Sequence, residues 1–280
     1  MAKPTEILRA YQDTIVVEEV AQVFENVASV QIRRIKSRVI ASREFFHELW
    51  GMYSQLRLDS KLKDDFGPAK TKNQAVLLIS SDSGLSGSID ERLVETMMQE
   101  VNIRLVDVVV IGRRAEQLLT QKHMKAVSVF PLPDITKSIR ILPLVNYLAP
   151  YKKVTIFYER FVSLSHQEIV AFELQESVKR LSEAESIRVD TNLMYASDYI
   201  FEPSLAEVVL YLESMMQATA LTEMILESRL AQLASRYTAM SSAHDNAEQR
   251  KNQLKRAYSI AQRRGKDQFN QIFISREQAK

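Results

Sequence analysis

Residues 205–273 read LAEVVLYLESMMQATALTEMILESRLAQLASRYTAMSSAHDNAEQRKNQLKRAYSIAQRRGKDQFNQIF. This stretch contains no proline, and Gly265 is its only glycine, so it favours one unbroken helix. At 1.5 Å per residue such a helix spans roughly 100 Å, whereas a small domain is about 30 Å across. The helix must therefore project from its own domain. Apolar or small residues recur along it in steps of three and four, as in a coiled coil, at Leu205, Val208, Leu212, Met215, Thr219, Leu226, Leu230, Leu233, Tyr237, Met240, His244, Ala247, Leu254, Tyr258 and Ala261.

The N-terminal region predicts the partner helix that this stripe needs. Pro4 suits the first turn of a helix, no proline follows before Leu58, and Gly67-Pro68 ends the region. Because the two long helices lie at opposite ends of the chain, we expect a long antiparallel two-helix coiled coil. The expected seam of the first helix again has four-three spacing and consists of Val20, Val23, Val27, Val30, Ile35, Val39, Ser42, Phe46, Leu49, Tyr53 and Leu56.

The middle of the chain alternates between strand-like and helix-like segments. Short apolar runs typical of buried strands lie at 75–79, 106–111, 126–130, 154–158 and 168–174. Helices are expected after a capping box from Ser88 to Glu91, at 113–121 and at 136–148, where Pro143 interrupts the pattern. This alternation predicts an inserted open α/β (Rossmann-like) domain. The predicted fold class is therefore α/β in three parts: residues 1–68 as the N-terminal coiled-coil helix, 69–203 as the α/β domain, and 204–280 as the C-terminal coiled-coil helix, with Ser204 as its N-cap.

Composition and motifs argue against several classes of protein. The chain has 280 residues, a net charge of +2, no cysteine and no apolar run long enough to span a membrane. It has no P-loop, and Ser88 breaks both the dinucleotide fingerprint and the nucleophile elbow in the turn after the first strand. Gly51 breaks the zinc pattern that begins at His47-Glu48. We therefore predict no catalytic, cofactor-binding or metal-binding residue, and an α/β enzyme with helical arms is disfavoured.

Two features of the last helix point to a partner. Basic residues crowd residues 250–266, which indicates either a solvated helix face or contact with acidic groups. A nucleic-acid-binding coiled coil is the alternative interpretation, although the run lacks interleaved aromatic residues. Beyond it, Phe269, Ile272 and Phe273 lie where the partner helix should already have ended. Apolar side chains on a lone helix need a covering surface, so we infer that another protein encloses this tip.

Several motifs resemble the gamma subunit, or central-stalk rotor, of F-type ATP synthases. The family's Ser-Asp-Arg-Gly-Leu-Cys-Gly-Gly turn corresponds to residues 81–88, and its Tyr-Ile-Phe-Glu-Pro-Ser to residues 199–204. Its last helix carries Glu-Ser, Arg-Met-x-Ala-Met and Ala-Thr-Asp-Asn-Ala, which resemble residues 227–228, 236–240 and 243–247. The chain departs from the family at Gln262-Arg263, where the order of the family's Arg-Gln is reversed, and at Phe269, which replaces a Glu. It is also poorly matched at Val20–Phe24, where the family has Lys-Ile-Thr-x-Ala-Met.

The resemblance implies a non-catalytic rotor with no cofactor of its own. Its partners would be the ring of alpha and beta subunits, an epsilon-type subunit and the membrane c-ring, and no nucleic acid would be expected. It would lie at the cytoplasmic face of a bacterial cell membrane as a peripheral subunit. The residues expected to contact the ring are Arg33, Arg34, Arg236, Met240, Asn246, Gln262, Arg263, Phe269 and Phe273. The family's turn in the α/β domain, which would form the foot of the rotor, maps to Ser81, Asp82, Gly84, Leu85 and Gly87.

Overall fold

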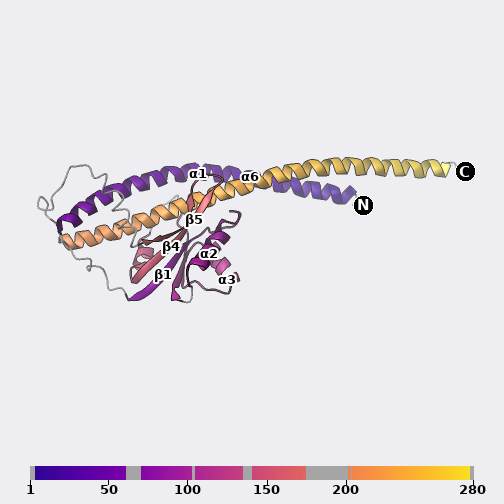
Figure 1. Ribbon diagram of the computed structural model, residues 1–280. Helices are drawn as coiled ribbons and strands as arrows, with labels where there is room; N and C mark the ends of the chain where they lie inside the picture. The colour runs from indigo at the N-terminus through magenta and orange to yellow at the C-terminus, as the bar shows by residue number, and fades with distance from the viewer. Residues whose placement is uncertain are drawn as a thin grey trace. The chain divides into compact units, whose positions relative to one another are not determined.

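The computed structural model describes residues 4–60, 71–102, 105–134, 141–174, 201–202 and 204–277 (Figure 1). The chain divides into two compact units. The first, here called the paired-helix unit, consists of Met1–Ser29 and Arg236–Lys280, and the second, the sheet unit, of Val30–Ser235. Each unit is described by itself. The three-part division expected from the sequence stays a prediction.

Two long helices account for both ends of the chain. Helix α1 runs over Pro4–Ser60 (57 residues), and helix α6 over Leu205–Glu277 (73 residues). Pro4 is the first residue of α1, as its missing N–H predicts. The hydroxyl of Ser204 accepts a hydrogen bond from the Glu207 N–H at 3.3 Å, so the predicted N-cap of α6 is confirmed. The expected stop at Gly67-Pro68 lies outside the described residues.

The middle of the chain forms the expected open α/β sheet. Its five strands lie in the order β3-β2-β1-β4-β5, in which the first four are parallel and β5 is antiparallel to β4. The strands are β1 (Lys72–Ile79), β2 (Asp107–Ile111), β3 (Ser128–Phe130), β4 (Tyr151–Phe161) and β5 (Gln167–Glu173). The described helices between them are α2 (Ile89–Glu100), α3 (Arg113–Gln121) and α4 (Leu142–Leu148).

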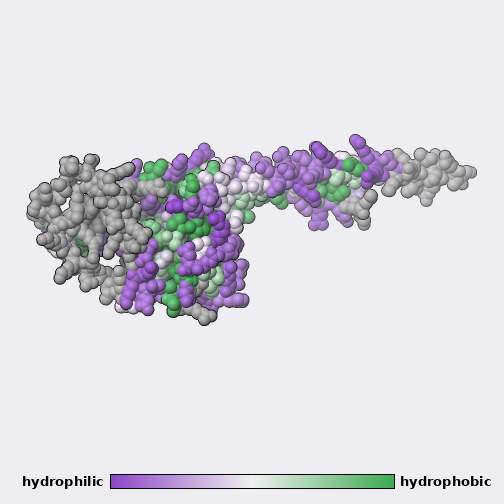
Figure 2. Space-filling view, in the orientation of Figure 1, coloured by the Kyte–Doolittle hydropathy of each residue, from purple (hydrophilic) through white to green (hydrophobic). Residues whose placement is uncertain are grey.

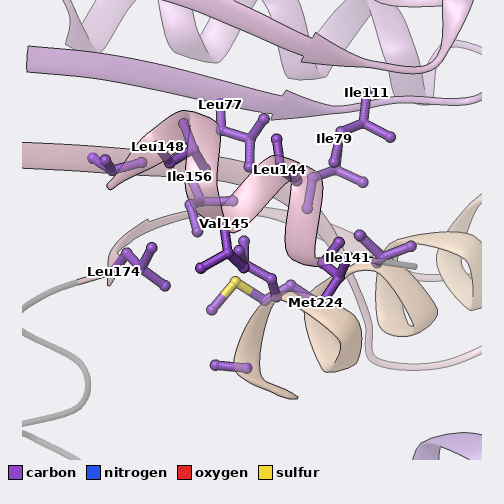
Figure 3. Packing of buried hydrophobic residues seen from close by; sticks show 14 of the residues in the cluster. Leu77, Ile79, Ile111, Ile141, Leu144, Val145, Leu148, Ile156, Leu174 and Met224 are labelled. Carbon is purple, nitrogen blue, oxygen red and sulfur yellow. The ribbon is translucent and has the colours of Figure 1, made fainter. Parts of the chain in front are cut away.

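Both faces of the sheet are covered, as near-continuous apolar strands require. Alternate residues of β1 face opposite sides: Val76 and Leu78 join the core under α2 and α3, whereas Leu77 and Ile79 join the core under α4 and α6. Figure 3 shows this second core from close by, with Met224 of α6 packed among residues of the strands and α4. Helix α6 is therefore built into the hydrophobic core of the sheet unit.

Helices α1 and α6 contact each other within each unit. In the sheet unit Ile35 and Val39 of α1 form a buried cluster with three leucines of α6, Leu226, Leu230 and Leu233. In the paired-helix unit Lys251 of α6 donates a hydrogen bond of 2.5 Å to Glu18 of α1. The buried side chains described in this unit are small: Ala21, Ala28 and Ala247.

The expected seam of the first helix is wrong at its N-terminal end. Val20, Val23 and Val27 are exposed, as is Val30 in the sheet unit, and Ala21 and Ala28 are buried instead. The buried set Ala21, Ala28 and Ile35 repeats every seven residues and lies one residue after Val20 and Val27, which have the same repeat. The alanines are in register with Ile35, which is also buried. Because alanine side chains are small, they let the two helix backbones approach closely. The valines are therefore left on a neighbouring face of α1.

Two local predictions in the sheet unit are also corrected. The side chain of Ser88 makes no capping hydrogen bond, and Glu91, the expected capping-box partner, accepts a hydrogen bond of 2.6 Å from Arg114 instead. Pro143 does not interrupt a helix, because α4 begins at Leu142 and Pro143 occupies its first turn. Residues 135–140, where that helix was expected to start, lie outside the described residues.

Candidate functional site

The carboxyl ends of the parallel strands form the edge at which open α/β sheets usually bind ligands. Here the chain fills that edge with its own side chains. Ser80, after β1, donates to the carbonyl of Ile111 at 3.0 Å, and its hydroxyl accepts the N–H of Ala115 at 3.1 Å. The Asp82 carboxylate accepts the N–H of Arg113 at 3.3 Å. The N-terminus of α3, where a phosphate would otherwise be bound, is thus occupied by a serine and an aspartate.

Gly112 is required for this closed arrangement. Its φ is 88°, in the region that favours glycine. A Cβ at this position would lie 2.3 Å from the carbonyl oxygen of Ser80. The loops after β1 and β2 therefore pack backbone against backbone at this point.

The five residues expected in the turn after β1 have different environments. The N–H of the buried Ser81 donates to Asp90 at 2.9 Å, and its hydroxyl lies 2.8 Å from the other carboxylate oxygen. Asp82 is half-buried. Gly84, Leu85 and Gly87 are exposed, and the last two have φ values of 69° and 63°. The segment folds as a turn that is held at Ser81 by the hydrogen bonds to Asp90.

Helix α6 crosses this edge and is hydrogen-bonded to it at two points. The Ser228 hydroxyl lies 3.3 Å from the carbonyl of Ile79, the last residue of β1. Seven residues further along α6, about two helical turns, the Ser235 hydroxyl donates to the carbonyl of Ser86 at 2.6 Å. The helix is therefore joined both to the end of the central strand and to the turn that follows it.

A buried carboxyl group forms the centre of this junction. Glu159 of β4 has no exposed surface, and its Oε2 accepts hydrogen bonds from the Ser228 hydroxyl and, at 2.9 Å, from the Gln232 amide. Burial raises the pKa of Glu159 well above its usual range, and the nearby charge of Asp90 raises the pKa further. The two hydrogen bonds act in the opposite direction.

The protonated form of Glu159 fits the local hydrogen-bonding pattern. Its Oε1 and the Oε1 of Gln232 are both buried without a hydrogen-bond partner. A proton on Glu159 would convert an acceptor into a donor within the very short contact between its Oε2 and the Ser228 hydroxyl, and would remove a buried negative charge. The junction is thus satisfied best by a neutral carboxylic acid.

Arg229 is a second ionisable group at the same junction. Burial lowers the pKa of its guanidinium, whereas the carboxylates of Asp82 and Asp134 act to raise it. The three elements that meet here are therefore the turn after β1, the end of β4 and residues 228–235 of α6. We define this set as the sheet–helix junction and take it as the candidate functional site.

Sequence reasoning missed Glu159 and Gln232. The strand at 154–158 was expected to stop one residue before Glu159, whereas β4 extends to Phe161. A lone glutamate directly after an apolar run was the available signal. Its partner Gln232, 73 residues away on helix α6, could not be identified from spacing alone.

The predicted ring contacts are distributed over both units. Arg33 and Arg34 are exposed on α1 in the sheet unit, and the others belong to the paired-helix unit. On α6, Arg236 and Met240 are half-buried, whereas Asn246, Gln262 and Arg263 are exposed. The side chains of Phe269 and Phe273 lie outside the described residues.

The described residues hold neither a metal-ligand cluster nor a membrane-spanning helix. Among the described side chains, no three or more His, Cys, Asp or Glu groups converge as a metal would require. Within the ranges given above, no helix combines the length and the apolar character needed to cross a membrane.

Comparison with known proteins identifies the family. A family model described as ATP synthase matches residues 7–264. The ATP synthase gamma chain of Chloroherpeton thalassium is 24% identical over 282 residues, which cover 93% of this chain and 92% of that relative. The chain belongs to the ATP synthase gamma-chain family. Another gamma chain, from Flavobacterium johnsoniae, is 24% identical over 87% of this chain and 86% of its own length.

Solved structures share the fold of this gamma-chain family member. A chain from the central stalk and c-ring structure of Tetrahymena thermophila mitochondrial ATP synthase superimposes with a TM-score of 0.57 at 20% identity. The match covers 80% of this chain and 99% of that chain. A chain from the Euglena gracilis mitochondrial ATP synthase also gives a TM-score of 0.57, at 14% identity over 91% of this chain and 94% of its own.

Proposed function

We propose that this chain is the rotor of a rotary F-type ATP synthase. It would couple rotation of the membrane ion-translocating ring to ATP synthesis or hydrolysis in the catalytic beta subunits. The chain itself would be non-catalytic, with nucleotide and metal bound by the other subunits. The observation that carries the proposal is the sheet–helix junction, because it fixes a 73-residue helix to the end of the α/β sheet.

The junction is suited to transmit torque. A twist of the sheet relative to α6 would break the hydrogen bonds of Ser228 and Ser235. It would also remove the hydrogen bonds that the buried Glu159 accepts from α6. It would also displace Met224 and its neighbours from the core between α6 and the sheet. Leaving a buried polar group without a partner costs about 1–3 kcal/mol. The sheet and the helix should therefore turn together.

The axle would be an antiparallel coiled coil of α1 and α6. Its support is the cluster of Ile35 and Val39 with the leucines of α6, and the Glu18–Lys251 ion pair in the paired-helix unit. Glu18 of α1 contacts Lys251, whereas Ile35, later in α1, contacts the earlier residues 226–233 of α6. Residue numbers therefore run in opposite directions along the two helices, as in an antiparallel pair. Pairing would stiffen the axle, and stiffness preserves the coupling between rotation and the catalytic sites.

Asymmetry is how such an axle would act on three identical catalytic sites. Each orientation offers different side chains to each beta subunit. A ligand shifts a conformational equilibrium only by its differential affinity for the two states, so different contacts favour different conformations of the three sites. The exposed Arg263 and Gln262, and the tip at Phe269 and Phe273, are proposed to contribute to these contacts.

The proposed partners are the alpha and beta subunits, an epsilon-type subunit and the c-ring, at the cytoplasmic face of a bacterial membrane. The similar solved structures are the central stalk and c-ring of one mitochondrial ATP synthase and the F1 and c-ring parts of another. In this assembly residues 69–203 would form the foot, and the helices of 1–68 and 204–280 the axle. No comparison favours the nucleic-acid alternative, and we do not retain it.

Co-expression with alpha and beta subunits of the same organism tests the proposal. The full chain should co-purify with both, and the complex should hydrolyse ATP. The chain alone should neither bind nor hydrolyse ATP. Failure to co-purify, or micromolar ATP binding by the purified chain in calorimetry, would refute the rotor assignment.

A further inference from the structure

The contacts of the sheet–helix junction form a closed ring through four elements of the sheet unit. Strand β4 is joined to α6, α6 to the turn after β1, and that turn to α2, whose charge acts back on β4. In this order the members are Glu159, Ser228, Gln232, Ser235, Ser86, Ser81 and Asp90. All of them except Ser235 are at most 2% exposed. A change of charge inside this ring therefore acts on the attachment of α6 to the sheet.

The Ser228 hydroxyl in this ring faces two acceptors and has only one proton to donate. It lies 3.3 Å from the carbonyl oxygen of Ile79 and in a very short contact with the Oε2 of Glu159. Its third contact, 3.1 Å from the Gln232 amide nitrogen, is a hydrogen bond that it accepts. A proton on Oε2 removes the conflict, because the carboxylic acid then donates to Ser228, and Ser228 donates to Ile79. This proton therefore links β4, α6 and the end of β1.

Loss of that proton would leave a charge buried away from water. Figure 2 shows hydrophilic side chains on the viewed surface of the sheet unit, where water can solvate their charges, whereas Glu159 has no exposed surface. An ionised carboxylate has about four acceptor positions, yet the Oε1 of Glu159 is buried without a hydrogen-bond partner. Such a charge is tolerated inside a protein only when it is paired.

The charged groups around Glu159 do not supply the pairing charge. The one that acts most strongly on its pKa is Asp90, which is itself acidic. Glu223 and Glu227 of α6 are acidic as well, and both raise the pKa of Tyr158 on β4. The basic groups on the neighbouring elements have partners of their own: Arg92 with the carbonyl of Gln167, Arg114 with Glu91, Arg160 and His166 with Glu168, and Arg229 with the charges of Asp82 and Asp134.

We propose that Glu159 is a proton-operated latch, which holds residues 228–235 of α6 against the sheet while it is protonated and releases them when it loses its proton. The only covalent change is transfer of the carboxyl proton to water. Separation of α6 from the end of β1 lets water reach the carboxylate, and the like charge of Asp90 favours that separation. The latch is a property of the chain alone, whereas its use rests on the proposed function. In the rotor, an open latch would let α6 turn without the sheet, so torque transfer would fall as the pH rises.

The direction and the size of the pH effect follow from proton linkage. In the open state the carboxyl is in water, where its pKa has the ordinary value of 4.5, whereas burial raises the pKa of the closed state well above this value. Between these two pKa values, the equilibrium constant for opening should increase about tenfold for each pH unit, as the release of one proton requires. Below and above this window the constant should not change with pH.

Thiol labelling of the full chain measures this opening. The chain contains no cysteine, and Ala231 is buried on α6 on the same side as Ser228 and Ser235, so Ala231→Cys adds one thiol that is reached only when the latch opens. Its labelling rate is compared with and without Glu159→Gln at each pH between 5 and 8, which cancels the titration of the thiol itself. The ratio of the two rates should increase with pH by up to about tenfold per unit. The matched control, Glu95→Gln at an exposed position of α2, should label like the chain with Glu159 intact.

A second thiol distinguishes local opening from unfolding of the whole sheet. Val109→Cys lies in the fully buried centre of β2, where labelling requires the sheet to unfold. Low concentrations of urea should accelerate labelling at position 109 steeply but should hardly change it at position 231, because local opening exposes little surface. If Ala231→Cys does not fold, amide hydrogen exchange over residues 81–86, the turn that Ser235 holds, replaces its labelling and should show the same pH dependence.

Two results would overturn the latch. A rate ratio that does not change with pH would mean that no proton on Glu159 controls the opening. Equal labelling rates and equal urea dependence at positions 109 and 231 would mean that α6 leaves the sheet only when the sheet itself unfolds. Both measurements use the isolated chain, so they can fail while the chain still co-purifies with alpha and beta subunits. Failure of co-purification, in turn, would refute the proposed function and leave the latch intact.

Discussion

Glu159→Gln should remove a pH dependence from the stability of this protein. Because burial raises the pKa of the folded carboxyl above the unfolded value of 4.5, the folded chain keeps a proton that the unfolded chain loses. The contribution of Glu159 to the free energy of unfolding is fully present below the unfolded pKa. It decreases as the pH rises towards the folded pKa. The loss is about 1.4 kcal/mol for each pH unit in that window.

The amide should fit the site better than a carboxylate. Its oxygen can accept from Ser228 and Gln232 as Oε2 does now, and the amide carries no charge whose burial must be offset. The variant should therefore equal or exceed wild type in stability at neutral pH. Glu159→Ala should be less stable than both, because it leaves Ser228 and Gln232 unpaired in a cavity.

Urea unfolding of the full chain between pH 5 and pH 8, followed by circular dichroism, measures the effect. The control is Glu168→Gln, an exposed carboxyl whose pKa is lowered by a hydrogen bond from Arg160. Its contribution has the opposite sign, since it is lost on acidification. The control should keep the wild-type decline with rising pH, whereas Glu159→Gln should flatten it. Parallel curves for wild type and Glu159→Gln would refute a protonated Glu159.

Three further predictions concern the axle, catalysis and the tip. Leu233→Pro breaks α6 at a buried position of the sheet unit and should cost about 3 kcal/mol or more, so circular dichroism should show lost helix and pull-downs should show lost assembly. Normal assembly would contradict the coiled coil. The chain should not restore hydrolysis to beta subunits whose catalytic site is disabled, as a phosphate-release assay would show; restored turnover would mean a catalytic site here. Phe269→Asp with Phe273→Asp should weaken seating in the ring more than Arg263→Ala with Arg264→Ala, because exposed charge pairs are worth about 0–1 kcal/mol. The arginine pair should instead alter the hydrolysis rate, and an aspartate pair that assembles as tightly as wild type would exclude an enclosed tip.

Periodicity was sufficient for the large elements of the fold. Buried strands such as Ala75–Ile79 are short apolar runs, and a proline-free stretch with a three-four repeat predicts a helix of the length of α6. Both signals arise from local backbone geometry, so a single sequence carries them. The same signals placed Ser204 at the start of α6.

Periodicity could not decide between two faces of α1. The valine pattern and the alanine pattern have the same spacing, and the valines are the more apolar set. The pairing instead buried Ala21 and Ala28, because fit to the partner helix and continuity with Ile35 outweighed hydrophobicity. That choice depends on a surface distant in sequence. The larger apolar set was left exposed.

The sheet–helix junction was beyond sequence reasoning for a related reason. Ser228 contacts Ile79 across 149 residues, and Glu159 contacts Gln232 across 73. Each residue alone looks like an ordinary polar residue at an element's end. Only the fold brings them together, and burial then changes the chemistry of Glu159.

Rotation tests the central claim most directly. The chain contains no cysteine, so Gln99→Cys, at an exposed position of α2, gives a unique attachment point for a bead on the sheet unit. With the alpha and beta ring fixed to a surface and ATP supplied, the bead should turn in one direction in steps of a third of a revolution. A bead that stays still or only diffuses, while the ring hydrolyses ATP at its full rate, would contradict the rotor account.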